Sequence, residues 1–193
     1  MVIKKILRAF DNVNNKLERV CRKTGSEIDL NRLLQRNNVN INLILFDDDE
    51  HTLLHLATLN GFTGCVDILL KYGANVSCRV KSSGNTCLHI ASWMGNLDIV
   101  KVICSREHPQ LDDLSNDHLT AFSLACWAGH VELCQYLLSM GASPTVRNRH
   151  GYSPLILAAR CGSYDVVNHL IKCDLCNINE IDNDGCSSLH HAC

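Results

Sequence analysis

The sequence predicts an all-α fold, a solenoid of stacked helix-turn-helix units that are joined by short β-hairpin-like loops. Three observations predict this class: a hexapeptide recurs at a nearly constant interval, a glycine recurs in the same register, and an apolar pair follows each glycine. A repeat of about 20–50 residues cannot bury its own apolar face, so neighbouring repeats must stack in a row.

The hexapeptide begins with a hydroxyl residue and continues with leucine, histidine and alanine positions. Its copies begin at residues 52, 86, 120, 153 and 187, so the intervals are 34, 34, 33 and 34 residues. Threonine or serine at a helix start accepts a hydrogen bond from a backbone N–H of the first turn, so each copy predicts the start of a helix. The copies read TLLHLA, TCLHIA, TAFSLA, SPLILA and SSLHHA.

A second helix is predicted after a glycine in each unit. Gly61, Gly95, Gly129 and Gly162 stand in one register and allow the tight turn that ends the first helix. Apolar residues eight and nine positions later mark the buried face of the second helix. These pairs are Leu69 with Leu70, Ile103 with Cys104, Leu137 with Leu138, and Leu170 with Ile171.

Together the landmarks resemble those of the ankyrin-repeat family, whose signature is T-P-L-H-x-A within a period of about 33 residues. The resemblance covers the chain from Asp47 to its C-terminus. Departures are mild, since proline is kept only at Pro154, and Ser123 and Ile156 replace the histidine in the third and fourth units. The resemblance implies an ankyrin-repeat solenoid that binds another protein.

The register divides the chain into six segments. Residues 1–46 are expected to form an N-terminal helical segment and a degenerate capping repeat, because Leu33 and Leu34 match the later apolar pairs. Apolar residues at helical spacing between Lys4 and Arg22 would form that cap's first helix or a separate arm. The ankyrin repeats are expected at 47–79, 80–114, 115–147 and 148–180, with a truncated fifth at 181–193.

Charge and hydropathy exclude two classes of partner. Lysine plus arginine (18) nearly balance aspartate plus glutamate (20), so no strong basic field is available for nucleic acid or anionic membranes. No uninterrupted apolar stretch approaches the roughly 20 residues of a membrane helix, and the polar residues from Asp11 onward come too early for a signal peptide. We therefore expect a soluble chain in the cytoplasm or the nucleus, with no membrane insertion.

The 12 cysteines would suggest a disulfide framework in a short secreted chain. Several of them instead occupy apolar helical runs, where a free cysteine acts as a small hydrophobic residue. The cysteines predicted to be reduced core residues are Cys65, Cys104, Cys126, Cys134 and Cys161.

Histidines 55, 89 and 190 recur at one position of the repeat, which indicates a scaffold role rather than metal binding. In the family that the chain resembles, this histidine hydrogen-bonds within and between loops. No phosphate loop, nucleophile elbow or carboxylate pair occurs outside the repeat positions. We therefore expect no catalysis, no cofactor and no small-molecule substrate.

A C-x-x-C pair raises the question of zinc. Cys173 and Cys176 could be combined with His190, His191 and Cys193. The motif lacks a second pair and lies where other units leave a helix for a loop, so no metal site is predicted.

The variable column two positions after the repeat alanine is the main candidate binding surface. It holds Leu59, Trp93, Trp127 and Arg160, which should lie on the concave face. Tryptophan and arginine are enriched in interface hot spots, and Met94 would add an adaptable apolar contact. The alternative is that each indole only covers the neighbouring helix.

Loop tips are the second candidate surface, because loops on a rigid scaffold commonly carry recognition. The position just before each hydroxyl residue is expected to point outward from its loop. It holds His51, Asn85, Leu119, Tyr152 and Cys186.

The predicted function is a non-catalytic scaffold that presents a concave groove to a peptide or protein. Because the fifth unit stops at Cys193, inside its first helix, the sequence also predicts a fragment of a longer chain. The alternative function follows from that prediction. The chain would be the regulatory or substrate-recruiting arm of a larger enzyme, such as a kinase, a ubiquitin ligase subunit or an acyltransferase, whose catalytic domain lies beyond Cys193.

Overall fold

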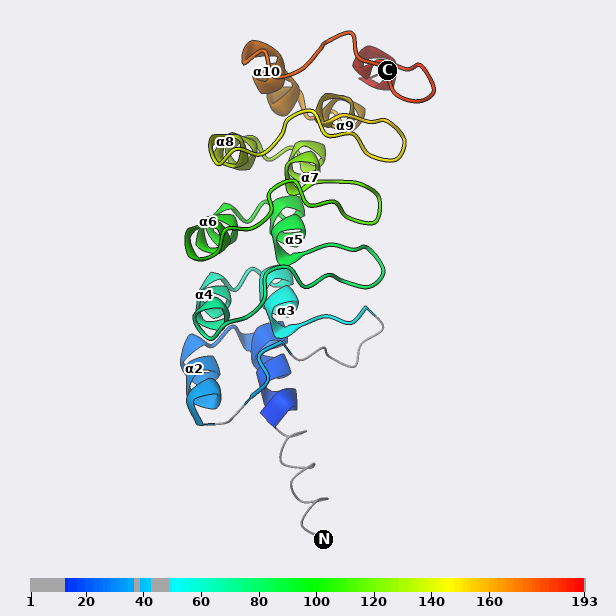
Figure 1. Ribbon diagram of the computed structural model, residues 1–193. Coiled ribbons are helices and arrows are strands. Elements are labelled where there is room, and N and C mark those ends of the chain that lie inside the picture. The colour runs from blue at the N-terminus through cyan, green and yellow to red at the C-terminus, as the bar shows by residue number, and fades with distance from the viewer. Residues whose placement is uncertain (1–12, 37–38, 43–48, 193) are drawn as a thin grey trace.

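The computed structural model describes residues 13–36, 39–42 and 49–192, and it is built from two parallel rows of short helices (Figure 1). Along the chain, successive helices belong alternately to an inner row and an outer row. The inner row comprises α3 (Leu53–Leu59), α5 (Cys87–Trp93), α7 (Ala121–Ala128), α9 (Pro154–Arg160) and α11 (Ser188–Ala192). The outer row comprises α4 (Thr63–Lys71), α6 (Leu97–Arg106), α8 (Val131–Ser139) and α10 (Tyr164–Lys172).

This arrangement confirms the predicted all-α solenoid. α3, α5, α7 and α9 each pack against the next inner helix and against the outer helix of their own unit, and α11 packs against α9. The described residues contain no sheet, and Ile181 and Ser187 form an isolated bridge. Within the same residues, no helix has the length and hydropathy that crossing a bilayer would need.

The N-terminal segment extends both rows by one helix. Residues 13–19 are helical and run into η1 (Val20–Thr24), which packs against α3, while α2 (Glu27–Arg36) packs against α4. Residues 13–24 therefore lie beside α3, in the position that the first helix of a repeat would take. Residues 1–12, 37–38 and 43–46 of the predicted capping segment lie outside the described residues.

The hydroxyl residues start the inner helices as predicted. The hydroxyl oxygen of Thr120 accepts a hydrogen bond from the backbone N–H of Ser123 at 3.0 Å, and that of Ser153 accepts from Ile156 at 3.2 Å. At Thr52 the cap is reciprocal, since the backbone N–H of Thr52 donates to Nδ1 of the histidine three residues later at 3.1 Å.

The repeat histidines link each unit to the loop that follows it. In His55 and His89 Nδ1 accepts from the capping threonine, so Nε2 holds the proton and donates. Nε2 of His55 lies 3.1 Å from the carbonyl oxygen of Cys78, and Nε2 of His89 lies 3.0 Å from that of Asp113 and 3.1 Å from that of Leu119. Both histidines are buried, which matches a scaffold role.

Projecting loops, called fingers here, connect each outer helix to the next inner helix (Figure 1). Neighbouring fingers are joined by asparagine side chains: Asn116 Nδ2 donates to the carbonyl oxygen of Ser82, and Asn183 Nδ2 donates to that of Arg149, both at 3.0 Å. Gly84 has a φ of 68°, and a Cβ there would lie 2.4 Å from the amide oxygen of Asn116. The described fingers span residues 72–86, 107–120, 140–153 and 173–187.

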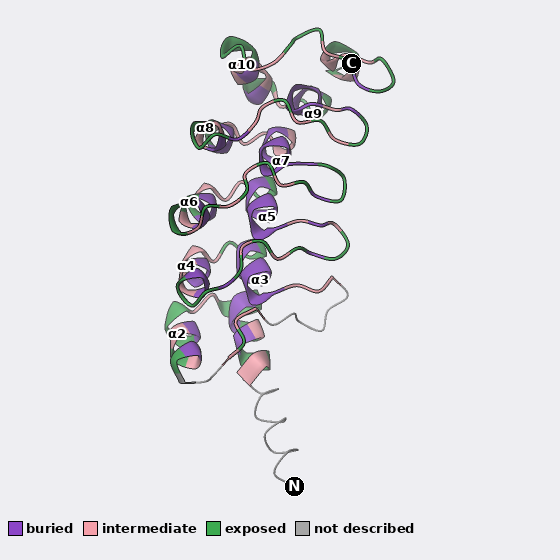
Figure 2. Cartoon of the chain, in the orientation of Figure 1, coloured by how far each residue is buried: buried purple, intermediate pink, exposed green. Residues whose placement is uncertain are grey.

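Burial is concentrated where the two rows meet (Figure 2). One continuous core runs from Leu17 in the first helical segment to Leu170 in α10, and Phe122 is the largest fully buried side chain. The outer surfaces of the outer helices remain exposed. The core is therefore shared between units rather than divided among them.

Four of the five cysteines predicted to be core residues are buried, and all the described cysteines are free thiols. The prediction is wrong for Cys161, which is exposed because it directly follows the last residue of α9. Burial raises the pKa of the Cys65 thiol to about 11 and that of the Cys87 thiol to about 12. These core thiols are protonated and therefore poor nucleophiles at neutral pH.

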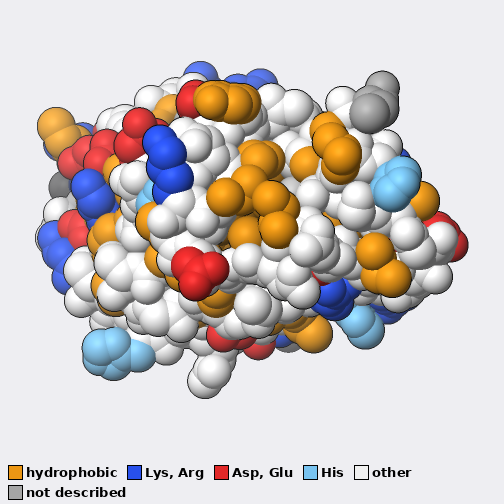
Figure 3. All heavy atoms as spheres, turned by 90° about the horizontal axis from the view of Figure 1, so that it is seen from above, with side chains coloured by type: hydrophobic (Ala, Val, Ile, Leu, Met, Phe, Trp, Pro, Cys, Tyr) orange, Lys and Arg blue, Asp and Glu red, His pale blue; other side chains and the backbone are white. Residues whose placement is uncertain are grey.

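The C-terminal face of the described solenoid exposes several hydrophobic side chains. Figure 3 views the molecule from this end and shows hydrophobic side chains gathered across it. The large hydrophobic residues exposed in the last two units are Tyr164, Ile171, Ile178, Ile181 and Leu189.

The burial of His89 predicts a pH-dependent stability. Burial lowers the pKa of His89, so the folded state keeps the ring neutral while the unfolded chain takes up a proton near pH 6.5. The unfolding free energy should therefore fall as the pH is lowered through about 6.5. Urea denaturation at several pH values between 5 and 7.5 measures how the unfolding free energy depends on pH.

The His89→Gln variant should have a free energy of unfolding about 1–3 kcal/mol lower than wild type at neutral pH. The reason is that the substitution leaves buried hydrogen-bonding groups unpaired. The same variant should show a shallower dependence on pH. The matched control is His108→Gln at an exposed position. An unchanged pH slope in His89→Gln would contradict this account.

Candidate functional site

The variable column lies along the inner helices, at or near the last residue of each. Leu59, Trp93 and Arg160 end α3, α5 and α9, and Trp127 lies one residue before the end of α7. The side chain of Trp93 is 44% exposed, that of Met94 is 49% exposed and that of Leu59 is 37% exposed. The column therefore presents large apolar side chains to solvent.

Its two tryptophans are in direct contact. The ring centroids of Trp93 and Trp127 are 5.2 Å apart and their planes meet at 74°, an edge-to-face arrangement. Such a pair is worth about 0.5–1.5 kcal/mol beyond the area it buries. Nε2 of His130 lies 3.2 Å from the carbonyl oxygen of Trp93, which links the end of α5 to the next unit.

The two indoles differ in their support. Trp127 is partly buried and packs on a small cluster formed by Leu119, Leu124 and Leu157. Trp93 is the more exposed partner. Trp127 therefore both covers its neighbours and forms part of the surface, whereas nearly half of the Trp93 side chain remains available.

A pocket of about 310 Å³ lies in front of the pair. It is lined by six of the residues predicted from the sequence: Leu59, Asn85, Trp93, Met94, Leu119 and Trp127. The other lining residues come from the inner helices and the fingers, namely Ser83, Ile90, Ser115, Asp117 and Leu124. We call this surface the tryptophan pocket.

The sequence prediction named Asn85 on the polar rim of the tryptophan pocket but missed Ser83, Ser115 and Asp117. Ser83 and Asp117 line it from two successive fingers, and they are 34 residues apart, one repeat period. A search for finger residues at that period would have found them. Their hydroxyl and carboxylate groups place hydrogen-bonding partners beside the indoles.

The predicted loop-tip position is at the base of each finger and not at its tip. The backbone carbonyl of Leu119 accepts from the N–H of Ser115 at 2.9 Å, and that of Tyr152 accepts from Asn148 at 3.0 Å. These bonds close the finger directly before the inner helix. The side chain of Leu119 is only 6% exposed and packs on the cluster under Trp127, so the expectation that it points outward is wrong.

The remaining predicted residues lie outside the tryptophan pocket. The guanidinium carbon of Arg160 is 5.2 Å from the ring of Tyr152, within the range of a cation–π contact. The ring of His51 is 6.0 Å from that of His55. The predicted set therefore divides into the pocket, an adjoining Arg160–Tyr152 pair, His51 before α3, and Cys186 before α11.

The C-x-x-C pair lies beside His169, which the sequence prediction did not name as a possible metal ligand. Sγ of Cys173 lies 3.7 Å from Nδ1 of His169, and Nδ1 of His190 lies 2.8 Å from the hydroxyl of Ser187. Among the described residues, no group of three potential metal ligands includes Cys173 or Cys176. Cys193 lies outside the described residues.

Stacked helical hairpins with projecting fingers define a protein of the helical-repeat class, whose units contact only their neighbours. The particular family follows from the family model described as ankyrin repeats (3 copies), which matches residues 17–113 and 122–193. The chain belongs to the ankyrin-repeat family.

Curated relatives share the repeats over part of their own length. The chain is 33% identical over 111 residues to "Probable 26S proteasome regulatory subunit p28" of Saccharomyces cerevisiae, a match that covers 57% of this chain and 49% of the relative. It is 23% identical to "Nuclear factor NF-kappa-B p105 subunit" of Gallus gallus, over 86% of this chain and 20% of that protein. It is 29% identical to "NAD-dependent deacetylase sir2B" of Dictyostelium discoideum, over 83% of this chain and 21% of that protein.

Because Trp127 is packed on a leucine cluster and Trp93 is more exposed, replacing each by alanine should lower the unfolding free energy by different amounts. Trp127→Ala should lower the unfolding free energy by about 2–3 kcal/mol, because it opens a cavity over the cluster beneath it. Trp93→Ala should cost about 1 kcal/mol or less, because its side chain is half exposed. Urea denaturation followed by far-UV circular dichroism measures both values, and equal costs would contradict the assignment.

Proposed function

We propose that the chain is a non-catalytic scaffold that binds a peptide or a protein surface through the tryptophan pocket. The observation that carries this proposal is the edge-to-face pair of the exposed Trp93 and the partly buried Trp127, beside which Met94 and Leu59 are exposed. Isolated apolar residues are common on protein surfaces, but a contiguous apolar patch with a polar rim is typical of an interaction site.

The energetics of the pocket favour an apolar anchor from the partner. Indole rings are among the side chains that contribute most to interface hot spots, and they lose little conformational entropy on binding when they are already packed. Trp127 is held by the leucines beneath it and in turn supports Trp93. The surface is therefore preorganised.

Specificity would come from the fingers. Ser83, Asn85, Ser115 and Asp117 surround the apolar floor with hydroxyl, amide and carboxylate groups. Such groups can pair with the backbone of an extended peptide, whose apolar side chain fills the pocket. Arg160, stacked on Tyr152, extends the surface along the next unit.

The alternative is that the indoles serve only to pack the repeats. Trp127 fits that alternative in part, because it covers Leu124 and Leu157. Trp93 and Met94 do not fit that alternative, because they are 44% and 49% exposed and the exposed surface contributes little to the stability of the fold. A binding role accounts for both residues.

The names of the relatives support binding as the general activity. Two of them are described as subunits, one of the 26S proteasome and one of nuclear factor NF-kappa-B. By the same likeness we propose a cytoplasmic or nuclear location.

A second candidate function is supported by the relative named as an NAD-dependent deacetylase. The match covers 83% of this chain but only 21% of that protein. Repeats of this kind thus occur within a much longer protein that is named as an enzyme. A regulatory or substrate-recruiting role in a larger enzyme would use the same tryptophan pocket.

The test compares three forms of the chain in affinity capture followed by mass spectrometry and by titration of each captured protein in purified form. The forms are wild type, the Trp93→Ala/Trp127→Ala double variant, and Tyr164→Ala as a control for an exposed aromatic residue on outer helix α10. The double variant should weaken binding by at least about 2 kcal/mol, or about 30-fold, whereas the control should bind as wild type does.

Circular dichroism must first show that all three forms are folded at the assay temperature. Trp93→Ala alone, which should cost little stability, provides a second test if the double variant unfolds. Equal affinities of wild type and a folded Trp93→Ala variant for every captured partner would reject the tryptophan pocket as the binding site.

A further inference from the structure

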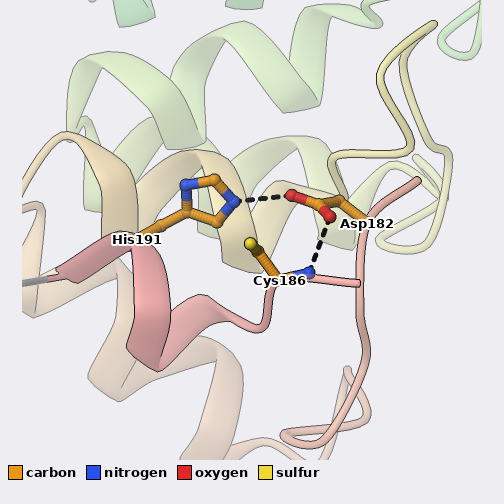
Figure 4. Close-up of side chains that lie close together, drawn as sticks. All are labelled: Asp182, Cys186 and His191. Atoms are coloured by element: carbon orange, nitrogen blue, oxygen red, sulfur yellow. Dashed lines mark hydrogen bonds and ion pairs between the residues drawn. The ribbon is translucent and has the colours of Figure 1, made fainter. Parts of the chain in front are cut away.

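The last finger and α11 bring together three side chains of the types that bind transition metals (Figure 4). Asp182, Cys186 and His191 each offer one ligand atom, and these atoms all lie within 4.8 Å of one another. Asp182 and Cys186 belong to the finger, whereas His191 projects from α11 toward them. The three residues lie within one short segment, and the cluster is distinct from the tryptophan pocket.

The finger backbone holds two of the three ligands in place. Oδ1 of Asp182 accepts hydrogen bonds from the backbone N–H groups of Asp184 at 2.9 Å and Cys186 at 2.8 Å. The N–H of Asp182 donates to the carbonyl oxygen of Cys186 at 3.0 Å. Oδ2 of Asp182 is left to face Nε2 of His191 at 2.6 Å, and this hydrogen bond is the main reason why the pKa of the Asp182 carboxyl lies below its usual range.

The finger turn itself does not require a carboxylate. Ser115 and Asn148 occupy the equivalent position in the two preceding fingers and close the same turn. The hydroxyl of Ser115 accepts from the N–H of Leu119 at 3.1 Å, and Oδ1 of Asn148 accepts from that of Tyr152 at 2.9 Å. The second oxygen of Asp182 therefore takes no part in closing the turn, and in the structure it lies 2.6 Å from Nε2 of His191.

The thiol and the imidazole also depart from the pattern of the neighbouring units. Cys186 takes the place of Leu119 and Tyr152, and His191 takes the place of Leu124 and Leu157. In those units the apolar residues form or pack on the cluster under Trp127. In the last described unit, a thiol and an imidazole therefore stand where the two preceding units have apolar side chains. The repeat fold requires neither the thiol nor the imidazole.

We propose that Asp182, Cys186 and His191 form a three-ligand site for a zinc ion. Carboxylate, thiolate and imidazole are all zinc ligands, and three protein ligands leave a fourth tetrahedral position for water or a donor from a partner. The ionised carboxylate and thiolate would neutralise the charge of the ion. A thiolate with an imidazole disfavours calcium and magnesium, which prefer sites made of oxygen atoms.

Binding requires two proton movements and a small adjustment. The Cys186 thiol releases its proton to solvent, and the proton of His191 moves from Nε2 to Nδ1, so that the Nε2 lone pair faces the ion. Nε2 and Oδ2 separate from 2.6 Å to about 3.3 Å, the distance between two ligand atoms each about 2.05 Å from a tetrahedral zinc. Oδ1 of Asp182 keeps its backbone hydrogen bonds and orients the carboxylate.

The experiment is a titration of the fully reduced 193-residue chain with cobalt(II), a spectroscopic substitute for zinc. Wild type should bind one cobalt ion with the visible absorption of tetrahedral coordination and a thiolate-to-cobalt charge-transfer band, both removed by one equivalent of zinc. Cys186→Ser should lose the charge-transfer band, and Cys186→Ser and His191→Gln should each bind more than about 100-fold more weakly.

Matched controls replace the neighbouring candidates. His190→Gln and Cys173→Ser, which alter an adjacent histidine and a cysteine of the C-x-x-C pair, should keep the wild-type spectrum and affinity. Absence of a tetrahedral spectrum in wild type would overturn the proposal. Loss of the spectrum in Cys173→Ser with retention in Cys186→Ser would also overturn it, because the metal would then lie at the C-x-x-C pair.

Discussion

A repeat of two short helices has no core of its own, and every other feature of this molecule depends on that constraint. The inner helices α3, α5, α7 and α9 bury their apolar residues against one another and against the outer row. Stability is therefore a property of the interfaces between units. The buried histidines strengthen these interfaces, since His55 and His89 cap their own helix and donate to the following loop.

The same stacking builds the candidate binding surface. Because equivalent residues of successive units lie side by side, a column that is variable in sequence becomes a continuous stripe in space. Two tryptophans one period apart thereby meet at 5.2 Å and share a pocket with residues of two fingers. The scaffold thus sets the position of the surface, while the identity of the column residues sets its chemistry.

Departures from the repeat pattern have different structural consequences. Ser123 and Ile156 replace the buried histidine, yet the hydroxyl oxygens of Thr120 and Ser153 still cap their helices by accepting from the backbone N–H groups of those two residues. The change at His191 is of another kind, because it replaces an apolar residue by an imidazole that reaches the carboxylate of the finger. A departure that the scaffold does not require is the more informative about function.

The sequence by itself determined the fold class, the helix starts and the placement of Trp93 and Trp127 in one column, because these follow from a period that is local and repeated. Only the tertiary structure decided which side chains are exposed. Leu119 is covered by the cluster beneath Trp127, Cys161 is left in solvent at the end of α9, and His191 finds Asp182 across the finger. Exposure and such pairings depend on how the fingers fold against neighbouring units, which a one-dimensional period does not specify.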